Sequence, residues 1–467
     1  MAFPVSRSAA IALLVAGAFF MENLDGTVVV TALPQMAASF RVHPVDLNIG
    51  VSAYLLTLAV LIPASGWVAD RYGARRVFAG AIVGFTLASL LCALCTTLPE
   101  FVLARVLQGL GGAIMVPVGR LTVLRSTEKH NLIKAIATIT WPGLAAPVLG
   151  PPLGGFITTY ASWHWIFLLN LPLGLIALPL ALTLIPAGKT VTGKPFDRFG
   201  FLLTGLACLM FMYGLELFSH QGAPWAAAGL CVLLGLGTAL LAVRHARRQE
   251  HPLIDFGALA YRSYATTIWG GSLFRSAIAA LPFLLPLMFQ LGFGLSSFAS
   301  GTLLLAVFAG NLAMKPFTTP ILRRFRFRSL LLVNGTLNAA AIFACALLTP
   351  GTPAPLTLAL LFVSGLTRSM QFTAINTLAF ADVPAAKMSG ANTLFNMAQQ
   401  MAMGVGIALG AVALRLAMLV HPDRHGVPLM AFHIAFAITG MISLAGLFDV
   451  LALSPRAGDA IRAKKAS

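Results

Sequence analysis

Residues 66–76 read GWVADRYGARR; they begin at the end of one apolar segment, 48–69, and lead into a second, 77–96. Each segment has the roughly 20 mostly apolar residues that a helix needs to cross the hydrocarbon core of a bilayer. Cytoplasmic loops of membrane proteins are enriched in Lys and Arg. The string between the two segments therefore predicts a short cytoplasmic turn between two membrane-spanning helices, and its basic residues are Arg71, Arg75 and Arg76.

Three other residues of this string have separate predicted roles. Gly66 permits another helix to approach closely, because it has no side chain. Asp70 can accept hydrogen bonds from backbone N–H groups at a helix end, or it can pair with a basic residue. Gly73 permits the backbone to turn tightly.

The whole chain has the composition of a membrane protein. Of its 467 residues 58% are hydrophobic, and only 10% are charged, against about 25% in an average soluble domain. This excludes a soluble or disordered protein. The net charge of +17 does not indicate nucleic-acid binding, because too little polar sequence remains for a basic face. Fourteen spans are predicted: 9–32, 48–69, 77–96, 101–119, 135–158, 165–186, 199–219, 225–243, 264–289, 298–320, 329–348, 355–378, 389–414 and 430–452.

The loops between these spans alternate in charge. One set of loops contains 24 of the 31 Lys and Arg residues, and the other contains Arg41, Arg415 and Arg424. By the positive-inside rule the basic set is cytoplasmic. We therefore expect a multi-pass protein of the bacterial cytoplasmic (inner) membrane with both termini in the cytoplasm. The first span is interpreted as a retained helix and not a cleaved signal peptide.

The chain also has two halves. A second basic turn, at 323–328, follows the tenth span as 71–76 follows the second. Such weak internal symmetry is typical of transporters built from repeats. The predicted fold is all-α, with two six-helix bundles and two inserted helices, and we expect a monomer. The predicted divisions are 1–186 for the N-terminal bundle, 187–262 for the inserted helices, 263–455 for the C-terminal bundle and 456–467 for a basic cytoplasmic tail.

Charges inside the first half of the membrane region are the main functional candidates. Glu22 and Asp25 are three residues apart, so they share one face of the first helix. A charge at mid-membrane is costly and usually faces a cavity, and two adjacent carboxylates raise each other's proton affinity. We expect them to carry protons, or one of them to hold an arginine in place. Arg105, in the fourth span, either tunes one of these carboxylates or forms a structural pair with the backbone or Asp70.

The second half contributes candidates for a substrate cavity. Arg275 lies deep in its span, and Asn392, Asn396 and Gln399 form a polar stripe at helical spacing. They line the substrate path or hydrogen-bond helices together. The five cysteines lie in apolar runs and are interpreted as packing residues. No metal site, cofactor or enzymatic centre is predicted.

Four motifs together resemble the major facilitator superfamily over the whole chain. Residues 66–76 resemble its signature loop, and residues 103–112 its fourth-span motif, which carries a buried arginine. Residues 24–34 resemble the first-span motif of the fourteen-span drug:proton antiporters of the EmrB/QacA type, with Val30 at the usual Asn. Within that branch the chain most resembles MdtD-type transporters. Residues 146–155 resemble the antiporter motif, with Ala146 at its first Gly, and contain Pro147, Gly150, Pro151, Gly154 and Gly155.

The resemblance implies that the antiporter-motif helix seals the protein against leak, although ordinary close helix packing explains those residues equally well. It also implies proton-driven export of amphipathic drugs by alternating access, with the small-molecule substrate, protons and the lipid bilayer as partners. Two alternatives remain open at this stage. One is export of a metabolite such as an organic acid or its metal chelate, and the other is a sensor or scaffold that transports nothing. Sequence physics does not exclude uptake.

Overall fold

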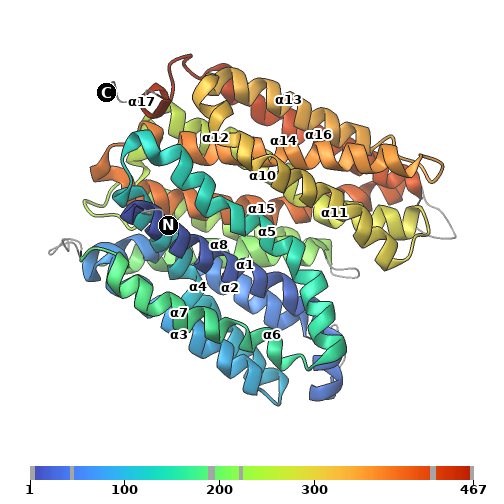
Figure 1. Ribbon diagram of the computed structural model, residues 1–467, viewed down its shortest axis with the longest axis horizontal. Coiled ribbons are helices and arrows are strands. Elements are labelled where there is room, and N and C mark those ends of the chain that lie inside the picture. Colours follow the sequence, from blue (N-terminus) through green and yellow to red (C-terminus); the bar gives the residue numbers. More distant parts are fainter. Residues whose placement is uncertain (1–5, 43–46, 188–194, 220–223, 421–427, 463–467) are drawn as a thin grey trace, which may run out of the picture.

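The computed structural model describes residues 6–42, 47–187, 195–219, 224–420 and 428–462; at a few helical positions it describes the backbone alone. Every regular element in these ranges is helical (Figure 1). The long helices of the first part are α1 (Arg7–Phe40), α2 (Asn48–Tyr72), α3 (Ala74–Leu94), α4 (Leu98–Ser126), α5 (Leu132–Tyr160), α7 (Asn170–Leu184), α8 (Arg198–Ser219) and α9 (Trp225–Ala246). Those of the second part are α10 (Arg262–Leu287), α11 (Ser297–Ala313), α12 (Lys315–Arg324), α13 (Phe327–Cys345), α14 (Ala354–Ala381), α15 (Met388–Val420) and α16 (Leu429–Leu451).

Shorter elements fill the connections. They are η1 (Lys129–Asn131), α6 (His164–Leu168), η2 (Phe256–Ala260), η3 (Met288–Gly292), η4 (Ala385–Lys387) and α17 (Asp459–Arg462). A helix covers each of the fourteen predicted spans, which confirms the all-α membrane fold. Among the described residues, twelve helices are long and apolar enough to cross a membrane. The remaining two predicted spans correspond to α5 and to α11 with α12, of which Ala299–Ala313 is a shorter apolar helix.

Local sequence explains where several helices begin and end. Gly73 has φ 84° and separates α2 from α3, so the predicted tight turn is present. Thr97 and Glu100 form a capping box at the start of α4, which satisfies backbone N–H groups that have no partner within the helix. Pro282 and Pro286 lie inside α10, and the π-helical turn η3 follows them.

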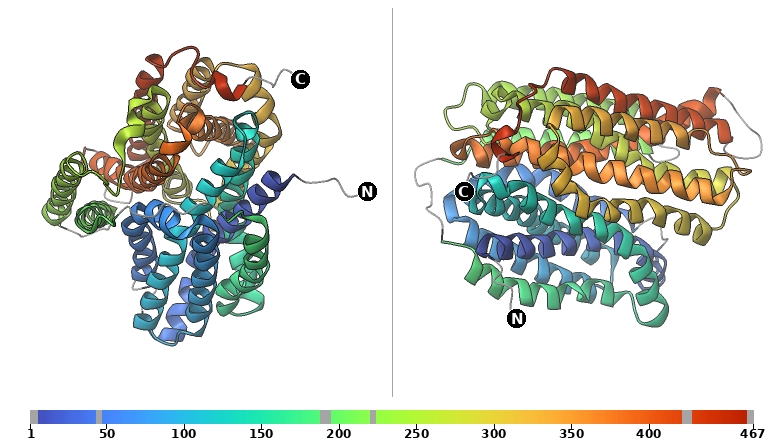
Figure 2. Two further views of the ribbon diagram at one scale, coloured as in Figure 1. Left: turned by 90° about the vertical axis from the view of Figure 1, so that its left-hand side faces the viewer. Right: turned by 45° about the horizontal axis from the view of Figure 1, so that its top comes forward.

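The helices form two bodies that lie against each other (Figures 1 and 2). Helices α1 to α7 contact one another in the first body, and α10 to α16 contact one another in the second. Helices α8 and α9 pack together at the edge of the molecule, and α8 also contacts α2 and α15. Helix α8 therefore touches both bodies where they meet at this edge.

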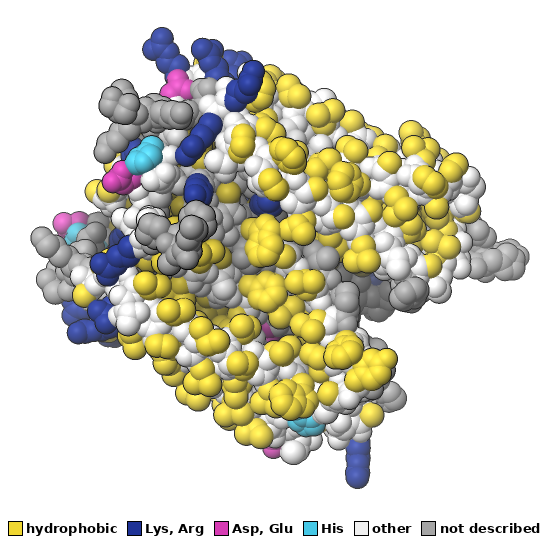
Figure 3. Space-filling model, in the orientation of Figure 1, with side chains coloured by type: hydrophobic (Ala, Val, Ile, Leu, Met, Phe, Trp, Pro, Cys, Tyr) yellow, Lys and Arg dark blue, Asp and Glu magenta, His cyan; other side chains and the backbone are white. Residues whose placement is uncertain are grey.

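One end of the molecule gathers most of the visible Lys and Arg side chains (Figure 3), and we call this end the basic side. Toward it the two bodies touch, through contacts of α2 with α15, of α5 with α12 and of α17 with η1, and α5 also contacts α11 and α14 of the second body. Toward the opposite side the two bodies diverge (Figure 1). The structure is thus closed between the bodies on the basic side.

The assignment of Arg120 to a loop is wrong. Hydropathy ends the fourth span at residue 119, which puts Arg120 in a loop. In the structure α4 continues to Ser126, and Arg120 is 7% exposed inside it. The guanidinium is tolerated there because it has a hydrogen-bond partner on the other body.

Candidate functional site

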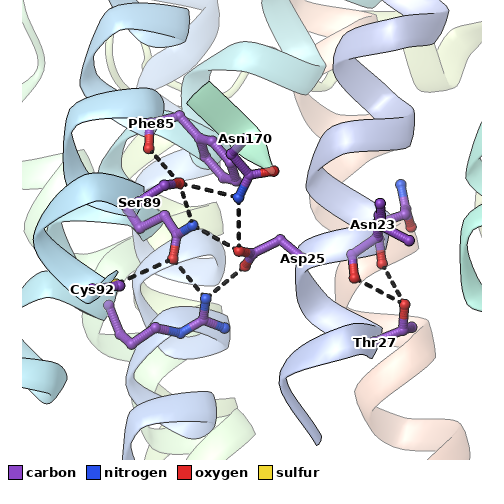
Figure 4. A network of polar contacts seen from close by, with 10 residues as sticks. Asn23, Asp25, Thr27, Phe85, Ser89, Cys92 and Asn170 are labelled. Carbon is purple, nitrogen blue, oxygen red and sulfur yellow. Dashed lines mark hydrogen bonds and ion pairs between the residues drawn. The ribbon is translucent and has the colours of Figure 1, made fainter. Parts of the chain in front are cut away.

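Asp25 lies at the centre of a buried polar network in the first body (Figure 4). It projects from α1 toward α3, α4 and α7, and it is 2% exposed. Arg105 of α4 is fully buried, and its Nη1 donates to Asp25 Oδ2 at 2.6 Å. Of the pairings considered for Arg105, the structure therefore contains the one with Asp25 and not the one with Asp70.

Two carboxamides complete the surroundings of Asp25. Gln108 Nε2 donates to Asp25 Oδ1 at 2.8 Å, and Asn170 Nδ2 donates to the same oxygen at 3.1 Å. Gln108 Oε1 in turn accepts from Arg105 Nη1 at 2.6 Å. Each of these three partners of the Asp25 carboxylate is thus a donor, and a carboxylate has only acceptor atoms to offer them.

Ser89 of α3 is hydrogen-bonded to both of these carboxamides. Its Oγ accepts from Gln108 Nε2 at 2.8 Å and from Asn170 Nδ2 at 3.1 Å, and it donates to the Phe85 carbonyl at 2.8 Å. The break between α6 and α7 places Asn170 at the first position of α7. Sequence reasoning assigned no role to Ser89, Gln108 or Asn170, because neutral polar residues occur throughout membrane helices and only packing shows which of them meet.

Glu22 lies one turn from Asp25 and is only partly exposed. Its Oε2 atom is buried without a hydrogen-bond partner among the described residues. Gly112 lies beside it: a Cβ there would stand at an ordinary contact distance of 3.6 Å from Glu22 Cδ, but at a tight 3.2 Å from Tyr54 Oη. The Tyr54 ring also lies under Arg105, with Cζ 4.3 Å from the ring centroid. The two carboxylates therefore differ, since one is fully hydrogen-bonded and the other has an oxygen without a donor.

A second polar cluster joins the two bodies. Arg120 Nη1 of α4 donates to Asn396 Oδ1 of α15 at 2.9 Å, and Asn392 Nδ2 donates to the Pro117 carbonyl at 2.8 Å. Both asparagines are buried. Of their two predicted roles, the structure shows helix-to-helix hydrogen bonding.

Two buried guanidiniums lie around one ring in this cluster. Arg120 Cζ is 5.2 Å and Arg275 Cζ is 4.6 Å from the centroid of Phe395. Arg275 is 1% exposed, and its Nη1 donates to the Thr267 carbonyl at 3.0 Å. Gln399, the last residue of the predicted stripe, has its Oε1 buried without a partner among the described residues.

The signature loop contacts both its own body and the other one. Asp70 Oδ1 accepts from Arg125 Nη2 at 2.8 Å, while Arg71, Arg75 and Arg76 surround the turn with exposed or half-exposed side chains. Gly66 packs against α15, where an added Cβ would overlap Thr393 Oγ1 and stand 3.3 Å from Ser389 Oγ. The close approach predicted for Gly66 therefore occurs, and it occurs across the interface.

The antiporter-motif helix α5 packs along α1. An added Cβ at Gly150 would overlap Thr27, so this glycine is needed for close packing, whereas Gly155 has open space on its Cβ side. Gly154 is buried. The side chains of Pro147 and Pro151, and that of Val30 in the first-span motif, lie outside the described residues.

A polar cluster outside the spans anchors the connection to α8. Burial raises the pKa of Asp197, but hydrogen bonds from the Gly200 N–H (2.8 Å), His245 (2.8 Å) and the Leu253 N–H (3.3 Å) outweigh it and hold the pKa below its ordinary value. Within the described residues, no group of three or more His, Cys, Asp or Glu side chains could hold a metal ion.

Comparisons with known proteins agree with this arrangement. The model of the Major Facilitator Superfamily matches residues 15–407. The "Putative multidrug resistance protein MdtD" of Pectobacterium carotovorum subsp. carotovorum (strain PC1) is 39% identical over 404 residues, which cover 86% of this chain and 86% of that protein. Its namesake from Enterobacter sp. (strain 638) is 40% identical over 407 residues, with 86% and 85% covered.

Two solved structures have a similar fold. The human organic anion transporter MFSD10 (TETRAN) aligns with a TM-score of 0.65 at 14% identity, over 96% of this chain and 100% of that chain. The proton:xylose symporter XylE, bound to 6-bromo-6-deoxy-D-glucose, aligns with a TM-score of 0.69 at 15% identity, over 97% and 96%. At these identities the likeness concerns the fold alone.

Proposed function

The chain belongs to the major facilitator superfamily, and on that premise we propose that it is a proton-coupled antiporter that exports amphipathic drugs. It is a transporter of the multi-pass inner-membrane type and not an enzyme. The drug cargo is supported by the relatives of about 39% identity, which are named for multidrug resistance. The MdtD-type resemblance is confirmed by the same relatives.

Asp25 is the proposed site of proton coupling. The observation that supports it is the fully buried ion pair with Arg105, at 2.6 Å in the middle of the first body. A proton arriving from outside neutralises Asp25, or Glu22 beside it, and so removes the charge that holds α1 to α4. Loss of that attraction favours return of the emptied carrier toward the cytoplasm, where the proton leaves and drug binds.

The other predicted sites fit this cycle as proposals. The basic side is the cytoplasmic side, where both termini lie, so the structure corresponds to the outward-facing state of alternating access. Gly66, Asp70 and the basic turn close that side, and Arg275 with Gln399 faces the substrate path. The bundles comprise 1–186 and 263–455, the helices of 187–262 face lipid, and the carrier works as a monomer.

The test is transport into everted membrane vesicles under an imposed pH gradient. Wild-type vesicles are expected to accumulate an amphipathic cationic dye, and Asp25→Asn vesicles to accumulate none above background. Glu128→Gln is the matched control, because Glu128 is an exposed carboxylate of the loop between α4 and α5. Accumulation by Asp25→Asn at the wild-type rate would show that the coupling site is elsewhere.

One observation favours a second cargo, an anionic metabolite. Arg120 and Arg275 place two guanidiniums around Phe395 between the bodies, an arrangement that suits a carboxylate better than a cation. A panel of drugs and organic acids offered to the same vesicles separates the two cargoes. If only the acids are transported, the drug assignment fails while the proton site remains. If neither class moves in wild-type vesicles, the remaining reading is a sensor or scaffold.

A further inference from the structure

We propose that Ser89 is a positioning residue that keeps the network around Asp25 unable to accommodate a proton while its hydrogen bonds stay in place. The inference rests on the proposed proton coupling at Asp25. Its basis is the direction of each hydrogen bond in the network, which is set by the chemistry of the atoms involved.

The hydroxyl of Ser89 has one proton, and the direction of its bond to Phe85 is certain. A carbonyl oxygen can only accept, so Ser89 Oγ donates this proton to the Phe85 carbonyl at 2.8 Å. Toward Gln108 and Asn170 the same oxygen can therefore only accept. This requirement turns the NH₂ group of each carboxamide toward Ser89.

The second N–H of each carboxamide then points at Asp25. Gln108 Nε2 and Asn170 Nδ2 both reach Asp25 Oδ1, at 2.8 and 3.1 Å, and Arg105 supplies the donor to Oδ2. A protonated carboxyl group needs an acceptor for its O–H. Among the described contacts of Asp25 there is none.

Only one partner of Asp25 could turn to offer an acceptor. Gln108 is fixed because its Oε1 accepts from Arg105 Nη1 at 2.6 Å, and turning it would set an N–H against that donor. Asn170 could turn its Oδ1 toward Asp25, but Oδ1 would then also face the lone pairs of Ser89. Ser89 can relieve this only by giving up its bond to Phe85.

Ser89 therefore makes protonation and rearrangement one event. A proton on Asp25 must therefore break at least one hydrogen bond of this network, which joins α1, α3, α4 and α7, and it cannot be stored in an otherwise unchanged network. Other titratable or charged groups facing Asp25 are Glu22 on α1, Tyr54 on α2, Cys92 on α3 and Arg105 on α4. None of these groups lies between Ser89 and Asn170, which are hydrogen-bonded directly to each other.

The experiment is a pH titration of the protonated-carboxyl infrared band that disappears in Asp25→Asn, recorded on the purified full-length protein in lipid without any drug. Removal of the hydroxyl in Ser89→Ala lets Asn170 turn and accept from protonated Asp25. The pH midpoint of the band is expected to rise by about 0.5–1 unit, the equivalent of one hydrogen bond.

Two controls separate positioning from general damage. Ser65→Ala removes an equally buried hydroxyl that donates to the Ile62 carbonyl of its own helix, and it should leave the midpoint unchanged. In an Asn170→Ala background the Ser89→Ala shift should vanish, because no carboxamide remains to turn. Ser89→Cys, with a weakly accepting thiol, replaces Ser89→Ala if that variant does not fold, and the same direction is expected.

An unchanged midpoint in Ser89→Ala, or a shift that persists without Asn170, overturns the inference. The readout does not depend on the cargo, so its outcome is separate from that of the drug assay. A wild-type protein without an Asp25-dependent band at any pH would contradict the proposed coupling site itself.

Discussion

Gly66 offers a direct perturbation of the closed basic side. Its bare backbone on α2 meets α15, and an added Cβ would overlap Thr393 Oγ1. Thr393 is buried, so its side chain has little space into which to move. Overpacking of this kind costs about 1–3 kcal/mol, which changes the ratio of two conformations by a factor of about 5–150. Gly66→Ala should therefore shift the protein from the closed toward the open arrangement on this side.

Distances between spin labels on the two bodies measure this shift. Glu128 lies in the α4–α5 loop and Arg326 in the α12–α13 loop, and both are exposed. Spin labels are attached to cysteines at these positions in an otherwise cysteine-free chain. Double electron–electron resonance spectroscopy should then show a larger fraction of long distances in Gly66→Ala than in the wild type. Gly84→Ala, where nothing lies within 4 Å of the new Cβ, should leave the distribution unchanged.

A compensating variant tests whether the contact between Gly66 and Thr393 holds the basic side closed. Thr393 Oγ1 has no hydrogen-bond partner among the described residues, so its removal leaves no buried group unpaired. Thr393 Cβ would stand 3.6 Å from the new Cβ, which is an ordinary contact. Gly66→Ala combined with Thr393→Ala should restore the wild-type distribution. A double variant as open as the single one, or a single variant as closed as wild type, would show that this contact does not hold the side closed.

Three further predictions concern stability and closure. Arg105→Met should destabilise the protein by about 3–5 kcal/mol, because the Asp25 charge remains buried without its partner. Unfolding in detergent should show that the double variant with Asp25→Asn recovers part of this loss. Additive effects of the two substitutions on the free energy of unfolding would contradict the pairing. Asp197 has a lowered pKa, so its stabilisation is complete above the unfolded-state value of about 3.9 and is lost as the pH falls through the folded-state value. The unfolding temperature of wild type should therefore fall more between pH 7 and pH 3 than that of Asp197→Asn, and parallel decreases would refute this. Arg120→Met removes the 2.9 Å hydrogen bond to Asn396, which is worth about 1.5–3 kcal/mol for a charged donor. This variant should increase the fraction of long spin-label distances between Glu128 and Arg326. No increase would mean that the bond does not contribute to closure.

The fold could be predicted from the sequence because each membrane span consists of a long run of apolar residues. A helix covers each predicted span, and the tight turn at Gly73 was predictable from residue type alone. The position at which α4 ends was not predictable in this way. A charge normally ends a span, and the hydrogen bond of Arg120 to Asn396 is a contact between residues far apart in the chain.

The site was predictable only in part, for a similar reason. Charges inside spans are costly, so the sequence alone indicates that Asp25 and Arg105 are functional candidates. Ser89 and Asn170 carry no such signal, because a single hydroxyl or carboxamide is tolerated on any face of a membrane helix. Their importance comes from packing, which brings α3 and α7 to the same carboxylate. Similarly, Asn392 and Asn396 formed a recognisable stripe, but its contact with α4 needed the structure.

Proton release on drug binding tests the central assignment most directly. Purified protein in a weakly buffered solution with a pH indicator should release protons when drug is added, because drug binding favours the charged form of Asp25 held by Arg105, Gln108 and Asn170. The Asp25→Asn variant should bind drug and release no proton. Proton release by that variant equal to wild type, at the same drug occupancy, would contradict the account.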